Sequence, residues 1–138
     1  MNEVKQYIVI RTDLNMSMGK TAAQASHASM KVFFDKMFQE ESTYVSSVAD
    51  SDVKKRSMWL TREEIQWVEG LFTKIVKRVK TEADLLKVYE KAKAAGLNVS
   101  LIKDAALTEL SEPAYTAIAI GPNYIDKCEP IVKRLQNL

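Results

Sequence analysis

The chain has 138 residues, of which 46% are hydrophobic and 28% are charged. A chain of this length forms one globular domain, and this composition excludes an intrinsically disordered protein. Its 20 Lys and Arg residues nearly balance 18 Asp and Glu residues, so the formal net charge is only +2 at neutral pH. A protein that binds nucleic acid over much of its surface has a larger basic excess. Any nucleic-acid contact is therefore expected to be local.

The sequence also argues against a membrane protein and a structural metal site. No apolar run approaches the roughly 20 residues that span a bilayer. The apolar run at residues 7–10 is too short for the core of a signal peptide, so a cytoplasmic protein is expected. With one cysteine, Cys128, and one histidine, His27, the chain cannot form an internal disulfide or a Cys/His zinc site.

The first half of the chain predicts one strand and two helices. Residues 6–11 are short, β-branched and aromatic, as in a buried strand, and the polar residues after them form a loop. A long helix is predicted from residue 19 to about 41, because this segment is rich in Ala, Met, Lys and Gln. The Ser-rich residues 42–55 predict a loop. Thr61 and Glu64 have capping-box spacing, so a short helix is expected to end near residue 70.

The second half predicts three strands and two helices. The strands are residues 72–79, 99–103 and 116–120, and Gly121 and Pro122 are expected to stop the last one. One helix begins near Thr81 and is closed by Gly96.

A final helix is expected at about 126–135, with Pro130 in or near its first turn. The order β-α-α-β-α-β-β-α predicts an α/β domain with helices packed on a four-stranded, partly parallel sheet.

The first loop resembles a phosphate-binding P-loop, because Gly19, Lys20 and Thr21 follow a strand and open a helix. That motif requires a glycine five residues before the Gly-Lys pair, and the residue there is Leu14, so the spacing argues against an NTPase. What remains is a lysine in the first turn of a helix, where backbone amides and the helix dipole favour an anion.

Four polar residues of this helix, Lys20, Gln24, His27 and Lys31, fall on one continuous stripe. The residues expected to face the core are Ala22, Ala25, Ser29 and Val32. A solvated face is one interpretation of the stripe and a binding surface is the other. His27 taken singly is interpreted as a hydrogen-bonded structural histidine rather than a catalytic base.

Asp104 follows the strand at 99–103, where open α/β sheets bind their ligands. If that strand runs parallel to the first one, Asp104 and Lys20 lie at the same edge of the sheet. A surface ion pair of little energetic value is the alternative interpretation.

Three ordered blocks of residues together resemble the archaeal and eukaryotic type of peptidyl-tRNA hydrolase. The first block is Arg11-Thr12-Asp13-Leu14, Met16, Gly19-Lys20, Ala22-Ala23-Gln24 and His27-Ala28. The second is Val99-Ser100-Leu101-Ile102, Asp104-Ala105 and Thr108, and the third is Thr116 with Ala119-Ile120-Gly121-Pro122. The resemblance covers nearly the whole chain except about residues 38–66.

The resemblance implies a cytoplasmic hydrolase that cleaves the ester between a peptide and the 3′ ribose of tRNA and so recycles the tRNA. It implies an α/β fold, with a four-stranded mixed sheet flanked by helices on both faces (three-layer α/β/α), a homodimer, and no organic cofactor. Residues 1–138 are expected to form a single such domain, with a variable excursion at about 38–66. The candidate catalytic residues are Lys20, Asp104, Thr108 and Thr116, and the candidate substrate-binding residues are Gln24, His27, Lys74 and Gly121.

These residue types suit acyl transfer to water. Lys20 at a helix start can stabilise the oxyanion that forms on the ester carbonyl. Two roles stay open for Asp104, which either orients Lys20 or accepts a proton from water directly or through Thr108 or Thr116. The amide of Gln24 suits holding substrate or water. One interpretation of Lys74 is that it contacts a tRNA phosphate. The other is that it lies on the solvent-exposed face of a strand without a binding role.

The chain departs from the family pattern beside these residues. Ser17 and Met18 replace a glycine and a lysine of the first loop. In the second block, Ala106 and Leu107 replace a glycine and an arginine, and Glu109 replaces a glutamine. Because phosphate contacts provide most of the affinity for tRNA, weaker or differently placed RNA binding is expected.

Basic residues at 54–56 or at 77, 78 and 80 can compensate for these losses, or can form a plain solvated face. A non-catalytic module that binds RNA ends or a protein partner through residues 106–109 is the alternative function. An enzyme that binds a phosphate ligand at the start of the first helix ranks last.

Overall fold

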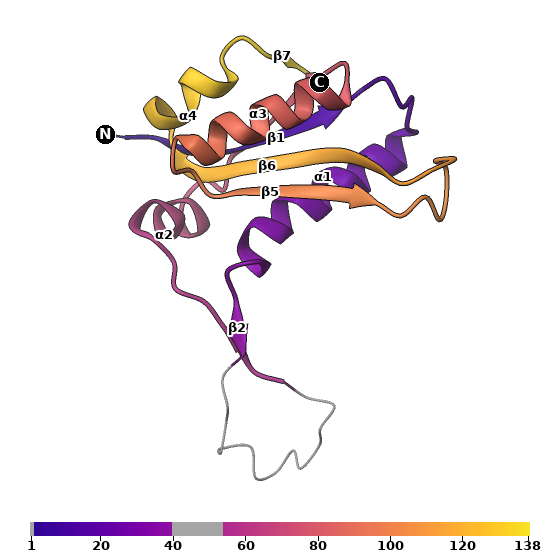
Figure 1. The fold of residues 1–138 in the computed structure, drawn as a ribbon. Coiled ribbons are helices and arrows are strands. Elements are labelled where there is room, and N and C mark those ends of the chain that lie inside the picture. The colour runs from indigo at the N-terminus through magenta and orange to yellow at the C-terminus, as the bar shows by residue number, and fades with distance from the viewer. Residues whose placement is uncertain (1, 40–53) are drawn as a thin grey trace.

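The computed structural model describes residues 2–39 and 54–138 and contains a mixed sheet with helices packed on it (Figure 1). The main elements are β1 (Val4–Arg11), α1 (Met18–Phe34), α2 (Arg62–Glu69), β4 (Lys74–Val79), α3 (Glu82–Ala94), β5 (Val99–Asp104), β6 (Ala114–Tyr124) and α4 (Ile125–Val132). Three two-residue strands complete the set: β2 (Phe38–Gln39), β3 (Arg56–Ser57) and β7 (Gln136–Asn137). The predicted loop at 42–55 lies almost wholly outside the described residues.

The sheet has the strand order β5-β6-β1-β4-β7. β4 pairs with β1 in parallel, whereas β6 is antiparallel to both β1 and β5. It follows that β1, β4 and β5 all run in the same direction, and their carboxyl ends lie at one edge of the sheet. The loop before α1 and residue Asp104 both leave the sheet at this edge, as the sequence predicted for parallel strands.

Helices cover both faces of the sheet, so the predicted three-layer α/β/α arrangement is confirmed (Figure 1). The central strand β1 is buried on both faces, because Tyr7 and Val9 pack beneath α3 and α4 while Ile8 and Ile10 pack toward α1. α2 lies on the α1 side, where Trp67 stacks on Phe33 at a ring-centroid distance of 5.7 Å.

Two predicted helix ends are wrong, and tertiary pairing explains both. α1 ends at Phe34 rather than near residue 41, because Phe38 pairs with Ser57 and Lys36 forms an ion pair with Glu64. α4 ends at Val132 with Pro130 in its second turn, because Gln136 and Asn137 leave the helix direction to pair with β4.

The sheet also differs from the prediction at two strands. β7 is a fifth strand, which the sequence did not indicate. β6 does not stop at Gly121 and Pro122 but continues to Tyr124, because the register with β1 shifts there and a proline is tolerated at such an irregularity. Across residues 2–39 and 54–138, we find no helix with the length and apolar character needed to cross a lipid bilayer.

Candidate active site

The start of α1 positions the first site residue, Lys20. The Ser17 side chain caps the helix by accepting a hydrogen bond from the Lys20 backbone N–H at 3.1 Å. Residues four positions apart lie on one side of a helix, so Lys20 and Gln24 point the same way. Gln24 begins the buried stripe of α1, which continues through Ala28 and Val32.

The interpretation of the α1 stripe as a solvated face is therefore wrong at Gln24, which is buried. Ala22, predicted to face the core, is exposed. A buried glutamine requires hydrogen-bond partners, because an unpaired polar group in the core is costly. Those partners are the other residues of the site.

Lys20 joins α1 to the end of β5 and the loop after it. Its Nζ donates to Asp104 Oδ1 at 2.7 Å and to Thr108 Oγ1 at 2.8 Å. The side chains of Lys20 and Asp104 are each only 11% exposed, so this ion pair is better shielded from water than an ordinary surface pair. An ammonium group has three donors, and within the described parts of the chain two of them have acceptors. The third N–H remains for a substrate.

The Asp104 carboxylate is held by several donors. Oδ1 also accepts from Gln24 Nε2 at 3.3 Å, and Oδ2 accepts from the backbone N–H of Ala106 at 2.9 Å. The hydrogen bond from Lys20 is the largest cause that lowers the pKa of Asp104, with smaller contributions from Ala106 and Gln24, against the opposing effect of burial. Asp104 is therefore ionised at neutral pH and is a weak base.

Gln24 extends the network into the core. Its Oε1 accepts a hydrogen bond of 2.5 Å from the hydroxyl of Thr116 on β6, and both side chains are buried. The structure thus brings together five of the eight residues predicted for the site, in one hydrogen-bonded set. These residues are Lys20, Gln24, Asp104, Thr108 and Thr116.

Replacing Gln24 with methionine is expected to lower the free energy of unfolding by about 1–3 kcal/mol, because the buried Thr116 hydroxyl loses its acceptor. Adding Thr116→Val should recover part of this loss, since removing both partners leaves no unpaired polar group. Urea denaturation of both variants measures the difference. A single variant as stable as the wild type would contradict this account of the network.

The loop after β5 is fixed to the start of α1. Glu109 accepts hydrogen bonds from the backbone N–H of Ser17, at 3.0 Å, and from its hydroxyl. These bonds lower the pKa of Glu109. Ala106 has a φ of +64°, a left-handed conformation that favours glycine. The N–H of the same residue donates to Asp104 Oδ2.

Replacing Ala106 with glycine is expected to raise the free energy of unfolding by about 0.5–1 kcal/mol. The left-handed conformation costs alanine about 1–2 kcal/mol, and the extra freedom of unfolded glycine offsets about 0.5–1 kcal/mol of the gain. The neighbouring exposed Ala105, which has no positive φ, provides the control, because Ala105→Gly should only destabilise. Thermal denaturation compares the two variants, and equal effects would count against strain at Ala106.

The other three predicted site residues lie apart from this set. Lys74 begins β4, at the opposite end of the parallel strands, where its Nζ lies 3.3 Å from the centre of the Phe72 ring and burial lowers its pKa. Gly121 lies in β6 five positions beyond Thr116, and its carbonyl accepts from the Gln6 side chain at 3.4 Å. His27 is exposed on α1, one turn beyond Gln24.

Sequence reasoning missed the supporting roles of Ser17, Ala106 and Glu109. It identified all three positions only as departures from the family pattern. A glycine usually stands where Ala106 does, and that preference was the available signal for a left-handed residue in this loop. The contact between Glu109 and Ser17 joins residues 92 positions apart, and no local pattern indicates it.

Comparison with known proteins agrees with this arrangement. Residues 4–138 match the family model described as peptidyl-tRNA hydrolase PTH2. The chain is 36% identical to a peptidyl-tRNA hydrolase of Staphylothermus marinus, over 99% of this chain and 96% of the relative. It is 33% identical to one of Methanocaldococcus jannaschii, over 98% of this chain and all of the relative. The chain belongs to the peptidyl-tRNA hydrolase PTH2 family.

Proposed function

We propose that this protein is a peptidyl-tRNA hydrolase, which cleaves the ester between a peptide and the 3′ ribose of tRNA. The observation that carries the proposal is the shielded ion pair between Lys20 and Asp104 at the carboxyl edge of the sheet. Its ammonium group keeps one donor for a substrate. The relatives that carry this enzyme name match the chain over nearly their full length.

Lys20 is the residue that stabilises the transition state. When water attacks the ester, negative charge develops on the carbonyl oxygen, and the third N–H of Lys20 donates to it. As the bond to the ribose breaks, the proton of the water passes to the departing 3′ oxygen, so the products are the free peptide acid and the tRNA 3′ hydroxyl. The interaction strengthens as charge develops, so it lowers the barrier more than it tightens substrate binding. The contacts with Asp104 and Thr108 hold the ammonium group in place before the substrate arrives.

Asp104 orients Lys20 rather than acting as the general base. Both of its oxygens accept hydrogen bonds, and its lowered pKa makes proton abstraction from water unfavourable. Gln24 and Thr116 fix the carboxylate from the core side. Thr108 accepts from Lys20, so its own hydroxyl proton is directed elsewhere and can bind the attacking water or the substrate.

The experiment that tests the function is release of the blocked amino acid from an N-acetylated aminoacyl-tRNA. The wild-type protein should hydrolyse this substrate with multiple turnovers, and Asp104→Asn serves as the inactive control. Absence of hydrolysis by the wild type, with tRNA binding retained in a shift assay, would instead identify a binding module on the same fold.

We also propose that the protein acts in the cytoplasm as a homodimer, as the family resemblance implies. Four apolar side chains on α2 and the turn after it are exposed and offer a surface for a second copy: Ile65, Val68, Leu71 and Phe72. Sedimentation equilibrium should give twice the mass of one chain, and Val68→Lys with Leu71→Lys should give the monomer mass.

A further inference from the structure

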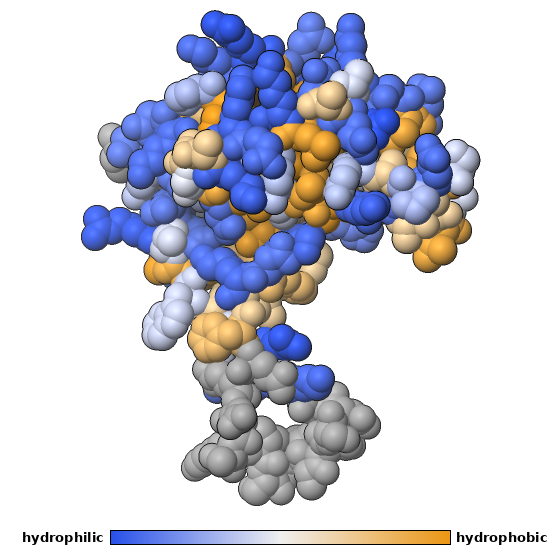
Figure 2. Space-filling view, viewed as in Figure 1, coloured by the Kyte–Doolittle hydropathy of each residue, from blue (hydrophilic) through white to orange (hydrophobic). Residues whose placement is uncertain are grey.

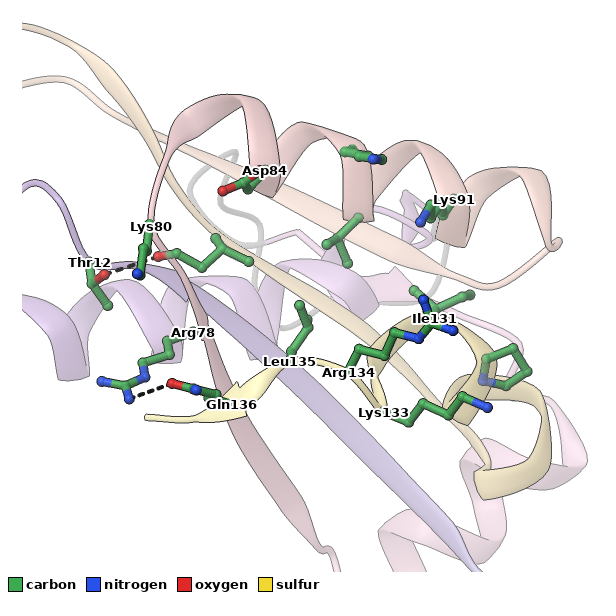
Figure 3. Close-up of a pocket in the computed structure, with 14 residues that line it drawn as sticks. Thr12, Arg78, Lys80, Asp84, Lys91, Ile131, Lys133, Arg134, Leu135 and Gln136 are labelled. Carbon is green, nitrogen blue, oxygen red and sulfur yellow. Dashed lines mark hydrogen bonds between the residues drawn. The ribbon is translucent and has the colours of Figure 1, made fainter.

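A groove of about 790 Å³ lies on the face of the sheet opposite the Lys20–Asp104 pair. It is bounded by α3, by the end of α4, by β4 and by the edge strand β7 (Figure 3). Its floor is apolar and includes Val79, Val88 and Leu135. None of the described residues that line it is aromatic. The groove is therefore suited to contacts other than stacking of nucleobases.

The rim of this groove is strongly basic. Its cations are Arg78, Lys80, Lys87, Lys91, Lys133 and Arg134. Among the described residues that line the groove, Asp84 is the one acid, so these residues carry a net charge of +5 in a chain whose total is +2. All six cations are exposed, and within residues 2–39 and 54–138 none has a carboxylate oxygen within 4.0 Å.

Helix dipoles do not account for this concentration of charge. Cations are favoured in the last turn of a helix, as at Lys91 in α3. Lys80 precedes α3 and Lys87 lies near its middle, so they have no such stabilisation. Figure 3 shows Lys80 and Lys91 on the α3 side of the groove and Lys133 and Arg134 on the α4 side. In Figure 2, hydrophilic side chains predominate over the top of the molecule, where Figure 1 places α3 and α4.

The rim of the active site has the opposite character. A second hollow, of about 550 Å³, lies beside the loop that carries Thr108. The described residues that line it include four acids, Asp13, Glu82, Glu109 and Glu112, and one cation, Arg11. Met18 and Leu107, which are 89% and 88% exposed, stand where the family pattern has basic residues. An RNA backbone is repelled from this hollow and gains its phosphate contacts elsewhere.

The basic groove opens at the same edge of the sheet as the active site. Thr12 and Lys80, which line its mouth, directly follow the carboxyl ends of β1 and β4. Asp104 ends β5, three strand spacings from β4 in the order β5-β6-β1-β4. With strands about 4.8 Å apart, the ends of β4 and β5 lie about 14 Å apart along this edge, and the groove begins on the other face of the sheet. A short single strand that leaves the active site can cross this distance.

We propose that the groove binds the sugar-phosphate backbone of the tRNA whose 3′ end occupies the active site. This inference rests on the proposed function. Lysine and arginine side chains that have no carboxylate partner, around an apolar floor, recognise phosphates without reading base sequence. Arg78 also donates a hydrogen bond to Gln136 at 2.7 Å (Figure 3). The groove supplies the affinity that the lost basic positions at Met18 and Leu107 do not provide.

The test replaces three groove lysines by Lys80→Gln, Lys87→Gln and Lys91→Gln in one protein. The matched control carries Lys31→Gln, Lys93→Gln and Lys127→Gln, which remove the same charge from exposed lysines outside the groove. Binding of deacylated tRNA is measured against salt concentration. The groove variant should bind at least about tenfold more weakly at 0.1 M salt, with a log-log salt slope smaller by about 2–3 than that of the control.

Hydrolysis separates this inference from the proposed function. The groove variant should show a raised KM for N-acetylated aminoacyl-tRNA with kcat unchanged. The same ester carried on only the three terminal nucleotides should be hydrolysed as fast as by the wild type.

Equal tRNA affinity and salt slope in the two triple variants would overturn the groove assignment. Slow hydrolysis of the three-nucleotide ester by the groove variant, but not by the control, would also overturn it. Preferential loss of binding to phosphatidylserine vesicles, with tRNA binding intact, would assign the groove to a membrane instead. A wild type that binds tRNA through the groove without hydrolysing the ester would overturn only the proposed function.

Discussion

Replacing Lys20 with alanine is expected to lower kcat for peptidyl-tRNA by two to three orders of magnitude. The substitution removes the donor assigned to the developing oxyanion, and loss of one such donor typically raises the barrier by about 2.7–4 kcal/mol. KM should change little, because phosphate contacts elsewhere provide most of the affinity. Single-turnover release of the blocked amino acid from its tRNA measures the chemical step directly.

The control for this prediction is Lys31→Ala on the same helix. Lys31 forms an exposed ion pair with Asp35 at 2.7 Å, the same distance as between Lys20 and Asp104. Removing it should leave kcat unchanged, since that pair lies in water and away from the site. Near-normal turnover by a folded Lys20→Ala protein would refute the assignment of Lys20.

Asp104→Asn is expected to lower kcat at least about a hundredfold while the fold is retained. Asparagine has the same shape but no charge, so it can keep one hydrogen bond to Lys20 without holding the ammonium group electrostatically. Asp35→Asn is the matched control, because it makes the same change in the exposed pair. Equal rates in the two asparagine variants would show that Asp104 does not position Lys20.

The pH dependence distinguishes an orienting aspartate from a general base. Because folding lowers the pKa of Asp104 below its ordinary value of 3.8, the ion pair stabilises the protein above that pH. This stabilisation is lost as the pH falls through the folded pKa. The rate should therefore show no acid limb from Asp104 between about pH 5 and 7, and a limb there that Asp104→Asn removes would favour the base instead.

Several local elements could be predicted because their causes are local. The capping box of Thr61 and Glu64 forms as expected, and the left-handed Gly96, with a φ of +76°, follows the end of α3. Both depend on residues within one helical turn of each other. The helix ends at Phe34 and Val132 depend instead on pairing with distant strands, so their sequence windows carried no signal.

The site was identified mainly through the family resemblance, because its residues lie far apart in the chain. Lys20 and Asp104 are 84 positions apart, and their contact requires that β1 and β5 run parallel. Periodicity placed Gln24 on a polar stripe, interpreted as either a solvated face or a binding surface. A helix pattern cannot show that the buried Thr116 on β6 will donate a hydrogen bond to it. Burial of Gln24 was thus decided by packing rather than by hydrophobicity.

The sequence by itself determined the α/β class, the order of the long elements, the family and the residue types of the site, because these depend on local periodicity and ordered motifs. Only the tertiary structure decided that Lys74 and Gly121 lie away from Asp104, and that two separate segments, 78–91 and 130–136, form one basic groove. The physical reason is that electrostatic and hydrogen-bond energies depend on distance in space, which strand order and register set.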